Sequence, residues 1–78
     1  MLTEFCGTVT IELNLNSSEG RTENMFTLQI EGNRTGPYNS VKGMTDRFPA
    51  YRGMIVRVCS RFSDDPTLPM EHRDLLSR

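Results

Sequence analysis

The sequence predicts a small α+β fold, in which a three-stranded, mainly antiparallel sheet has one face covered by a crossover segment or short helix. Three observations predict it: alternating apolar residues in two N-terminal segments, a third such segment over residues 53–62, and helical spacing near the C-terminus. The 78 residues leave room for a single small domain, residues 1–78, with a short C-terminal helix. A small open barrel of the SH3-like or OB-like kind is the alternative architecture.

The first two strands are predicted to form a hairpin. From Phe5 to Leu15 every odd position is apolar or glycine, which is typical of a half-buried strand. A second strand over residues 23–31 alternates in the same way, and the intervening NSSEGRT favours a turn. Because facing residues of an antiparallel hairpin share a face, the apolar pairs are predicted to be Leu13 with Phe26, Ile11 with Leu28, and Val9 with Ile30. A slip of two residues keeps the same faces and stays open.

Residues 53–62, GMIVRVCSRF, are predicted to form the third strand. Alternation divides this segment between two faces, one with Met54, Val56, Val58 and Phe62 and the other with Ile55, Arg57, Cys59 and Arg61. If the strand pairs antiparallel with the first, Cys6 can lie opposite Cys59, within reach of a disulfide or a thiol pair. The same register places Glu4 opposite Arg61.

Two short helices complete the predicted fold. The connection over residues 32–52 is too long to be structureless in a compact domain, and Gly36-Pro37 marks a turn within it. Ser40 can then cap a helix that ends at Pro49. This helix would cover the sheet with Val41, Met44 and Phe48. An irregular or extended segment crossing the sheet is the rival interpretation. Near the C-terminus, helical spacing relates Leu68, His72, Leu75 and Leu76.

Composition and motifs argue against several classes of function. The chain is 36% hydrophobic and 24% charged, which is typical of a folded soluble domain. Apolar runs fall short of the roughly 18 residues of a membrane span, and the N-terminus lacks a basic leader, so we expect a cytoplasmic protein without membrane contact. Cys6, Cys59 and His72 are too few to ligate zinc. With no catalytic or cofactor motif, we expect neither an enzyme nor a bound cofactor or metal.

Charge is sorted along the chain. Residues 1–32 carry a net charge of −4, residues 33–62 carry +5, and residues 63–78 carry −2, which together give −1. Five of the six cations in the middle segment are arginines, and aromatic residues are interleaved with them. Arginine and tyrosine anchor protein interfaces, and both can also stack on nucleic-acid bases. The candidate contact residues are Arg47, Tyr51, Arg52, Arg57 and Arg61. A plainer interpretation is that these arginines pair with the protein's own glutamates while the aromatic residues fill its core.

The function predicted from the sequence is that of a non-enzymatic protein-binding module. A small chain without catalytic motifs fits a regulator or inhibitor that docks on a larger protein or ribonucleoprotein through its Arg/Tyr-rich face. The alternative is a nucleic-acid-binding protein that uses the same basic segment, residues 33–62. A sequence pI near 5.7 argues against it, because dedicated nucleic-acid binders usually present a basic domain. Open sheet edges and a small core leave both a monomer and a homodimer open.

Overall fold

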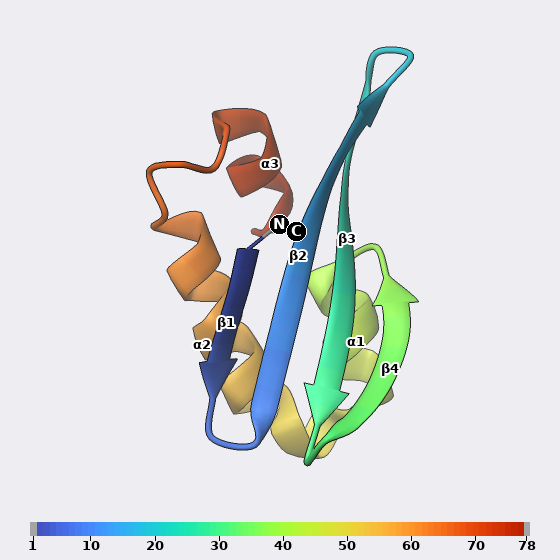
Figure 1. Cartoon of the computed structure of the whole chain (residues 1–78), viewed down its shortest axis with the longest axis vertical. Helices are drawn as coiled ribbons and strands as arrows, with labels where there is room; N and C mark the ends of the chain where they lie inside the picture. Colours follow the sequence, from blue (N-terminus) through green and yellow to red (C-terminus); the bar gives the residue numbers. More distant parts are fainter. Residues whose placement is uncertain (1, 78) are drawn as a thin grey trace.

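The protein forms a four-stranded antiparallel sheet with short helices on one face (Figure 1). The computed structural model describes residues 2–77. The elements in chain order are β1 (Leu2–Cys6), β2 (Val9–Ser18), β3 (Arg21–Ile30), β4 (Asn33–Tyr38), α1 (Val41–Arg47), the 3-10 turn η1 (Pro49–Tyr51), α2 (Arg52–Ser63) and α3 (Met70–Leu75). The α+β class and the antiparallel sheet are therefore confirmed, whereas the sheet has four strands and not the predicted three.

The β2–β3 hairpin has the register that its apolar pattern predicts. Leu13 faces Phe26, Ile11 faces Leu28 and Val9 faces Ile30. These six side chains are between 0% and 7% exposed. The hairpin closes through a two-residue loop, Glu19–Gly20, in which both residues have positive φ. Such loops match the right-handed twist of the flanking strands, which is why so short a connection suffices.

The first predicted strand is two strands and not one. A two-residue loop, Gly7–Thr8, separates β1 from β2, and the chain reverses there. Because of this reversal, β1 does not continue the alternation of β2. Cys6 faces Val9 on the core side of the sheet, whereas Phe5 faces Thr10 on the open side and is 65% exposed. The prediction that Phe5 shares the buried face of Val9 is wrong.

The fourth strand, β4, lies in the segment that was predicted to be a crossover. Another two-residue loop, Glu31–Gly32, turns the chain back along β3. Gly36-Pro37, predicted as a turn, lies inside β4 with a cis peptide bond, near a shift in the register against β3. An edge strand tolerates proline because its outer side needs no ladder hydrogen bonds. The strand order β1-β2-β3-β4 leaves β1 and β4 as unpaired edges, so the sheet is open and not a barrel.

The predicted third strand is the helix α2. Its buried residues follow helical spacing at i, i+3, i+4 and i+7: Ile55, Val58, Cys59 and Phe62. The apolar residues of this segment fit both the alternation of a strand and the spacing of a helix. The segment folds as a helix, which places these four side chains on a single buried face. Val56, predicted to share a face with Val58, is 44% exposed. The register that would have placed Cys6 opposite Cys59 across two strands does not arise, because Cys59 lies in a helix, and both cysteines are free.

The other two helices form where the sequence indicates. Ser40 caps α1, where its hydroxyl accepts a hydrogen bond of 3.0 Å from the Gly43 amide. Met44 on this helix is fully buried, and the chain passes into η1 at Pro49. At the C-terminus α3 buries His72, which is only 4% exposed. No helix within residues 2–77 has the length and apolar character needed to cross a membrane.

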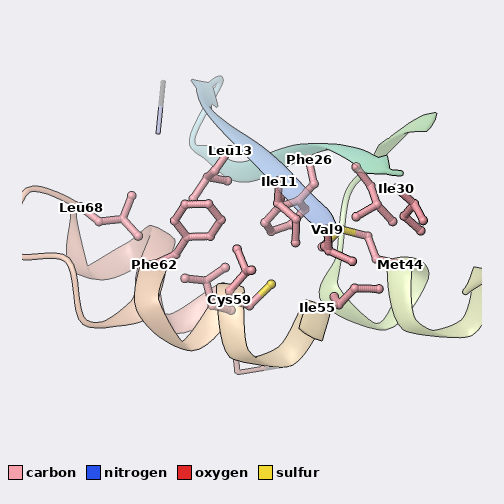
Figure 2. Packing of buried hydrophobic residues seen from close by; sticks show 13 residues of the cluster. Val9, Ile11, Leu13, Phe26, Ile30, Met44, Ile55, Cys59, Phe62 and Leu68 are labelled. Carbon is pink, nitrogen blue, oxygen red and sulfur yellow. The ribbon is translucent and has the colours of Figure 1, made fainter. Parts of the chain in front are cut away.

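The core lies between the sheet and the helical layer. Side chains from β2 and β3 meet those of α1 and α2, and Phe62 lies directly beneath Leu13 (Figure 2). The buried apolar residues are Val9, Ile11, Leu13, Phe26, Leu28, Ile30, Met44, Ile55, Val58, Cys59, Phe62, Leu68 and Leu76. This packing leaves the outer surface of α1 and α2 facing solvent, and that surface carries the candidate arginines.

Candidate interaction surface

Four arginines predicted as contact residues are exposed on the helical layer. Arg47 ends α1, Arg52 begins α2, and Arg57 and Arg61 follow along α2. Arg47 also lies over the ring of Phe48, with 5.4 Å between its guanidinium carbon and the ring centroid. All four therefore belong to the same layer, although they come from different turns.

The helical turn divides these arginines between two sides of α2. Arg57 and Arg61 are four residues apart and lie on one side. This side faces β1, because Arg61 Nη1 donates a hydrogen bond of 2.6 Å to the carbonyl oxygen of Phe5. Arg52 precedes Arg61 by nine residues, or about two and a half turns, and so lies on the opposite side, which faces α1. The sequence predicts one arginine face, whereas the fold presents two flanks of a helix.

Within residues 2–77, these four arginines form no ion pair with a carboxylate. The ion pairs among residues 2–77 are Arg21–Glu23 at 3.5 Å, Arg34–Glu12 at 3.4 Å and Lys42–Asp46 at 2.7 Å, and all are solvent-exposed. None involves Arg47, Arg52, Arg57 or Arg61. The strand register that would place Glu4 opposite Arg61 does not form, because residues 53–62 lie in the helix α2, and Arg61 donates to the carbonyl oxygen of Phe5. Ion pairs within the described part of the chain thus account for Arg34 and Lys42, whereas the other four cations of the basic segment form none there.

The aromatic side chains of the basic segment pack against the core or form hydrogen bonds within the protein. Tyr51 is half-buried against the core, and its hydroxyl donates a hydrogen bond of 3.3 Å to Glu31 Oε2. Tyr38 donates to Thr35 Oγ1 at 3.1 Å, and Phe62 is fully buried. Tyr51, predicted as a contact residue, is therefore held toward the β3–β4 loop. These rings do not form a row of exposed stacking planes beside the arginines.

A groove runs along the outer side of the helical layer. Its wider part has a volume of about 550 Å³ and is lined by Val41, Lys42, Thr45, Asp46, Pro49, Arg52 and Val56. Its narrower part, of about 200 Å³, is lined by Val41, Val56, Cys59, Ser60, Ser63, Leu76 and Ser77. Val41 and Val56 belong to both parts, so the two hollows adjoin. The sequence reading missed this groove, since it placed Val56 on a buried strand face.

A buried polar pair fixes the end of the helical layer to the sheet. Asn24 of β3 is 2% exposed, and its amide donates a hydrogen bond of 3.0 Å to the backbone carbonyl of His72. The amide oxygen of Asn24 lies 2.6 Å from His72 Nδ1. Because the amide nitrogen is the donor to the carbonyl, the oxygen must accept, which assigns the proton to Nδ1. His72 is thus a structural residue, and the sequence signal for it was the inward position of Asn24 on β3.

Both cysteines are free thiols in the described part of the chain. Burial raises the pKa of the Cys59 thiol to about 12, which keeps it neutral and unreactive near pH 7. Within residues 2–77, no three His, Cys, Asp or Glu side chains are grouped so that they could hold a metal ion.

Comparison with known proteins adds no further constraint: no protein-family model, curated protein or solved structure matches this chain. Functional inference therefore depends on the chain's own surface.

Proposed function

We propose that this protein is a non-enzymatic binding module, a small regulator or inhibitor that docks on a larger protein through the exposed arginines of α1 and α2. The observation that carries the proposal is the lack of any ion pair, within residues 2–77, for the four arginines Arg47, Arg52, Arg57 and Arg61. Arginine is enriched at protein interfaces, where its side chain combines charge, planar hydrogen bonding and apolar contact.

Nucleic acid could attract the same cations, and it is the competing outcome. Two features favour a protein partner. The rings of Tyr51 and Phe62 are engaged within the fold, whereas binding to single strands relies on exposed aromatic stacking. The sequence pI near 5.7 also differs from the basic character of dedicated nucleic-acid binders.

The proposal is tested by affinity capture from the native host with charge-reversed variants as baits. We expect Arg52→Glu or Arg57→Glu to abolish capture of a specific protein that the wild-type chain retains. Arg21→Glu is the matched control: it makes the same charge change in β3, outside the helical layer, and should leave capture intact. Circular dichroism checks that each variant is folded. Undiminished capture by both helical variants would contradict the proposal.

A parallel arm tests the competing outcome. Mixed DNA and RNA fragments are passed over the immobilised protein at about 50 mM salt, where phosphate contacts are strong. We expect no retention. Retention that weakens with salt, with a log–log slope near −0.9 for each duplex phosphate contacted, would replace the protein partner with nucleic acid.

A further inference from the structure

We propose that the groove between α1 and α2 binds a short acidic segment of the partner protein, with apolar side chains against Val41 and Val56 and a carboxylate paired with Arg52. This inference rests on the proposed function and specifies the chemistry of the partner.

The shape of the groove follows from helical spacing. Arg52, Val56 and Ser60 succeed each other at intervals of four residues along one side of α2. Val41 and Thr45 stand in the same relation on α1. Between Arg52 and Ser63 the α2 wall rises by roughly 16 Å, at about 1.5 Å per residue. That length accommodates about five residues of extended chain, at about 3.3 Å each.

The middle of the groove offers an apolar contact that the fold itself does not use. Val56 is 44% exposed and lies where the two parts of the groove adjoin. Val41 is half-buried beside it, and Leu76, which is 8% exposed, lines the narrower part. The apolar lining would favour the aliphatic side chains of a peptide over a sugar-phosphate backbone.

The charged side chains that line the groove favour an acidic occupant. Asp46 also lines the wider part, but the ammonium of Lys42 lies 2.7 Å from its carboxylate and compensates it. Arg52 has no ion-pair partner within residues 2–77, and the first turn of α2 contains no acidic residue. The positive end of the α2 dipole adds to the charge of Arg52. The wider part is therefore net positive, while the narrower part is lined by neutral serines.

The test uses two synthetic peptides that share their apolar residues and carry charges of opposite sign. Acetyl-Leu-Leu-Glu-Glu-amide and acetyl-Leu-Leu-Lys-Lys-amide are titrated into the full chain while the methyl NMR signals of Val41, Val56 and Leu76 are followed. We expect saturable shifts with the glutamate peptide, with a dissociation constant on the order of 1 mM. The lysine peptide should bind at least about tenfold more weakly, since it meets Arg52 with a like charge.

Three variants locate the binding. Val56→Asp should abolish the shifts, and Arg52→Glu should reverse the preference in favour of the lysine peptide. Arg21→Glu is the matched control, because it makes the same charge change in β3, outside the groove lining, and should alter binding by less than about twofold. Each change is at an exposed position, so the fold should survive.

The outcomes separate this inference from the proposed function. Absent shifts, equal shifts with both peptides, or binding that survives Val56→Asp would overturn the groove as an acidic-peptide site. Shifts of the groove methyls with protein concentration alone would also overturn it, by making a second copy the occupant. If partner capture is lost in Arg57→Glu but retained in Arg52→Glu and Val56→Asp, the groove inference fails while the proposed function stands. If capture is insensitive to all three, the proposed function fails.

Discussion

Asn24 connects the last helix to the sheet through a single side chain. Its amide binds both the carbonyl and the ring of His72, which lies 48 positions further along the chain. Both residues are nearly free of solvent contact. A buried polar group that loses its partner remains desolvated but is no longer hydrogen-bonded, which raises the free energy of the folded state. Each member of the pair therefore stabilises the fold mainly by keeping the other hydrogen-bonded.

We therefore predict that Asn24→Ala lowers the free energy of unfolding by about 1–3 kcal/mol, because it leaves the buried ring and backbone carbonyl of His72 without hydrogen-bond partners. Urea unfolding followed by circular dichroism measures the change as a lower midpoint. Asn16→Ala is the matched control, because Asn16 is an exposed residue of β2, and it should shift the free energy by less than about 0.5 kcal/mol. Equal midpoints for the two variants would show that the buried pair contributes nothing.

At the scale of the element, α2 shows where sequence reasoning reached its limit. Its segment alternates apolar and polar residues well enough to resemble a strand, yet Ile55, Val58 and Phe62 also fit one helical face. Local pattern cannot separate these interpretations in a short apolar segment, and tertiary packing decides between them. In the hairpin of β2 and β3 the apolar pattern determines which residues share the buried face, because a slip of one residue would place apolar side chains opposite polar ones. A slip of two residues would keep the same faces, so the alternation alone did not select the observed register.

Two valines of α2 distinguish the helix from the predicted strand. In a strand Val56 and Val58 share a face, so truncating either would cost the same. In the helix Val58 is fully buried, whereas Val56 is 44% exposed. We expect Val58→Ala to destabilise the fold by about 1.5–3 kcal/mol through lost burial and a residual cavity. Val56→Ala should stay within about 0.5 kcal/mol, because alanine is also the better helix former. Similar unfolding midpoints for both variants would contradict the helix.

The candidate site was predictable in composition but not in arrangement. The sequence identifies Arg47, Arg52, Arg57 and Arg61 as an excess of positive charge that few nearby acids can offset. It could not reveal that Arg52 and Arg61 lie on opposite sides of one helix, because that depends on the element type. The groove likewise depends on how α1 packs beside α2, which no local pattern specifies.

At the scale of the whole molecule, β2 and β3 are paired with outer strands over only part of their length. Within residues 2–77, β1 pairs with β2 as far as Leu13, and β4 pairs with β3 as far as Phe26. Beyond those points β2 and β3 continue as a two-stranded ribbon that projects past the rest of the sheet (Figure 1). The contact between Asn24 and α3 is the tertiary hydrogen-bonded support that this ribbon receives within residues 2–77.

This uneven support predicts a gradient of local stability along the hairpin. An isolated two-stranded ribbon is marginal in water, whereas central strands open only with global unfolding. Amides of residues 15–18 and 21–23 should therefore exchange with deuterium at least about tenfold faster than hydrogen-bonded amides of residues 9–13 and 26–30, as NMR-detected exchange can measure. Asn24→Ala should accelerate exchange in the ribbon more than in the central pairs, because it removes the contact with α3. Uniform protection along both strands would mean that the ribbon unfolds only with the core.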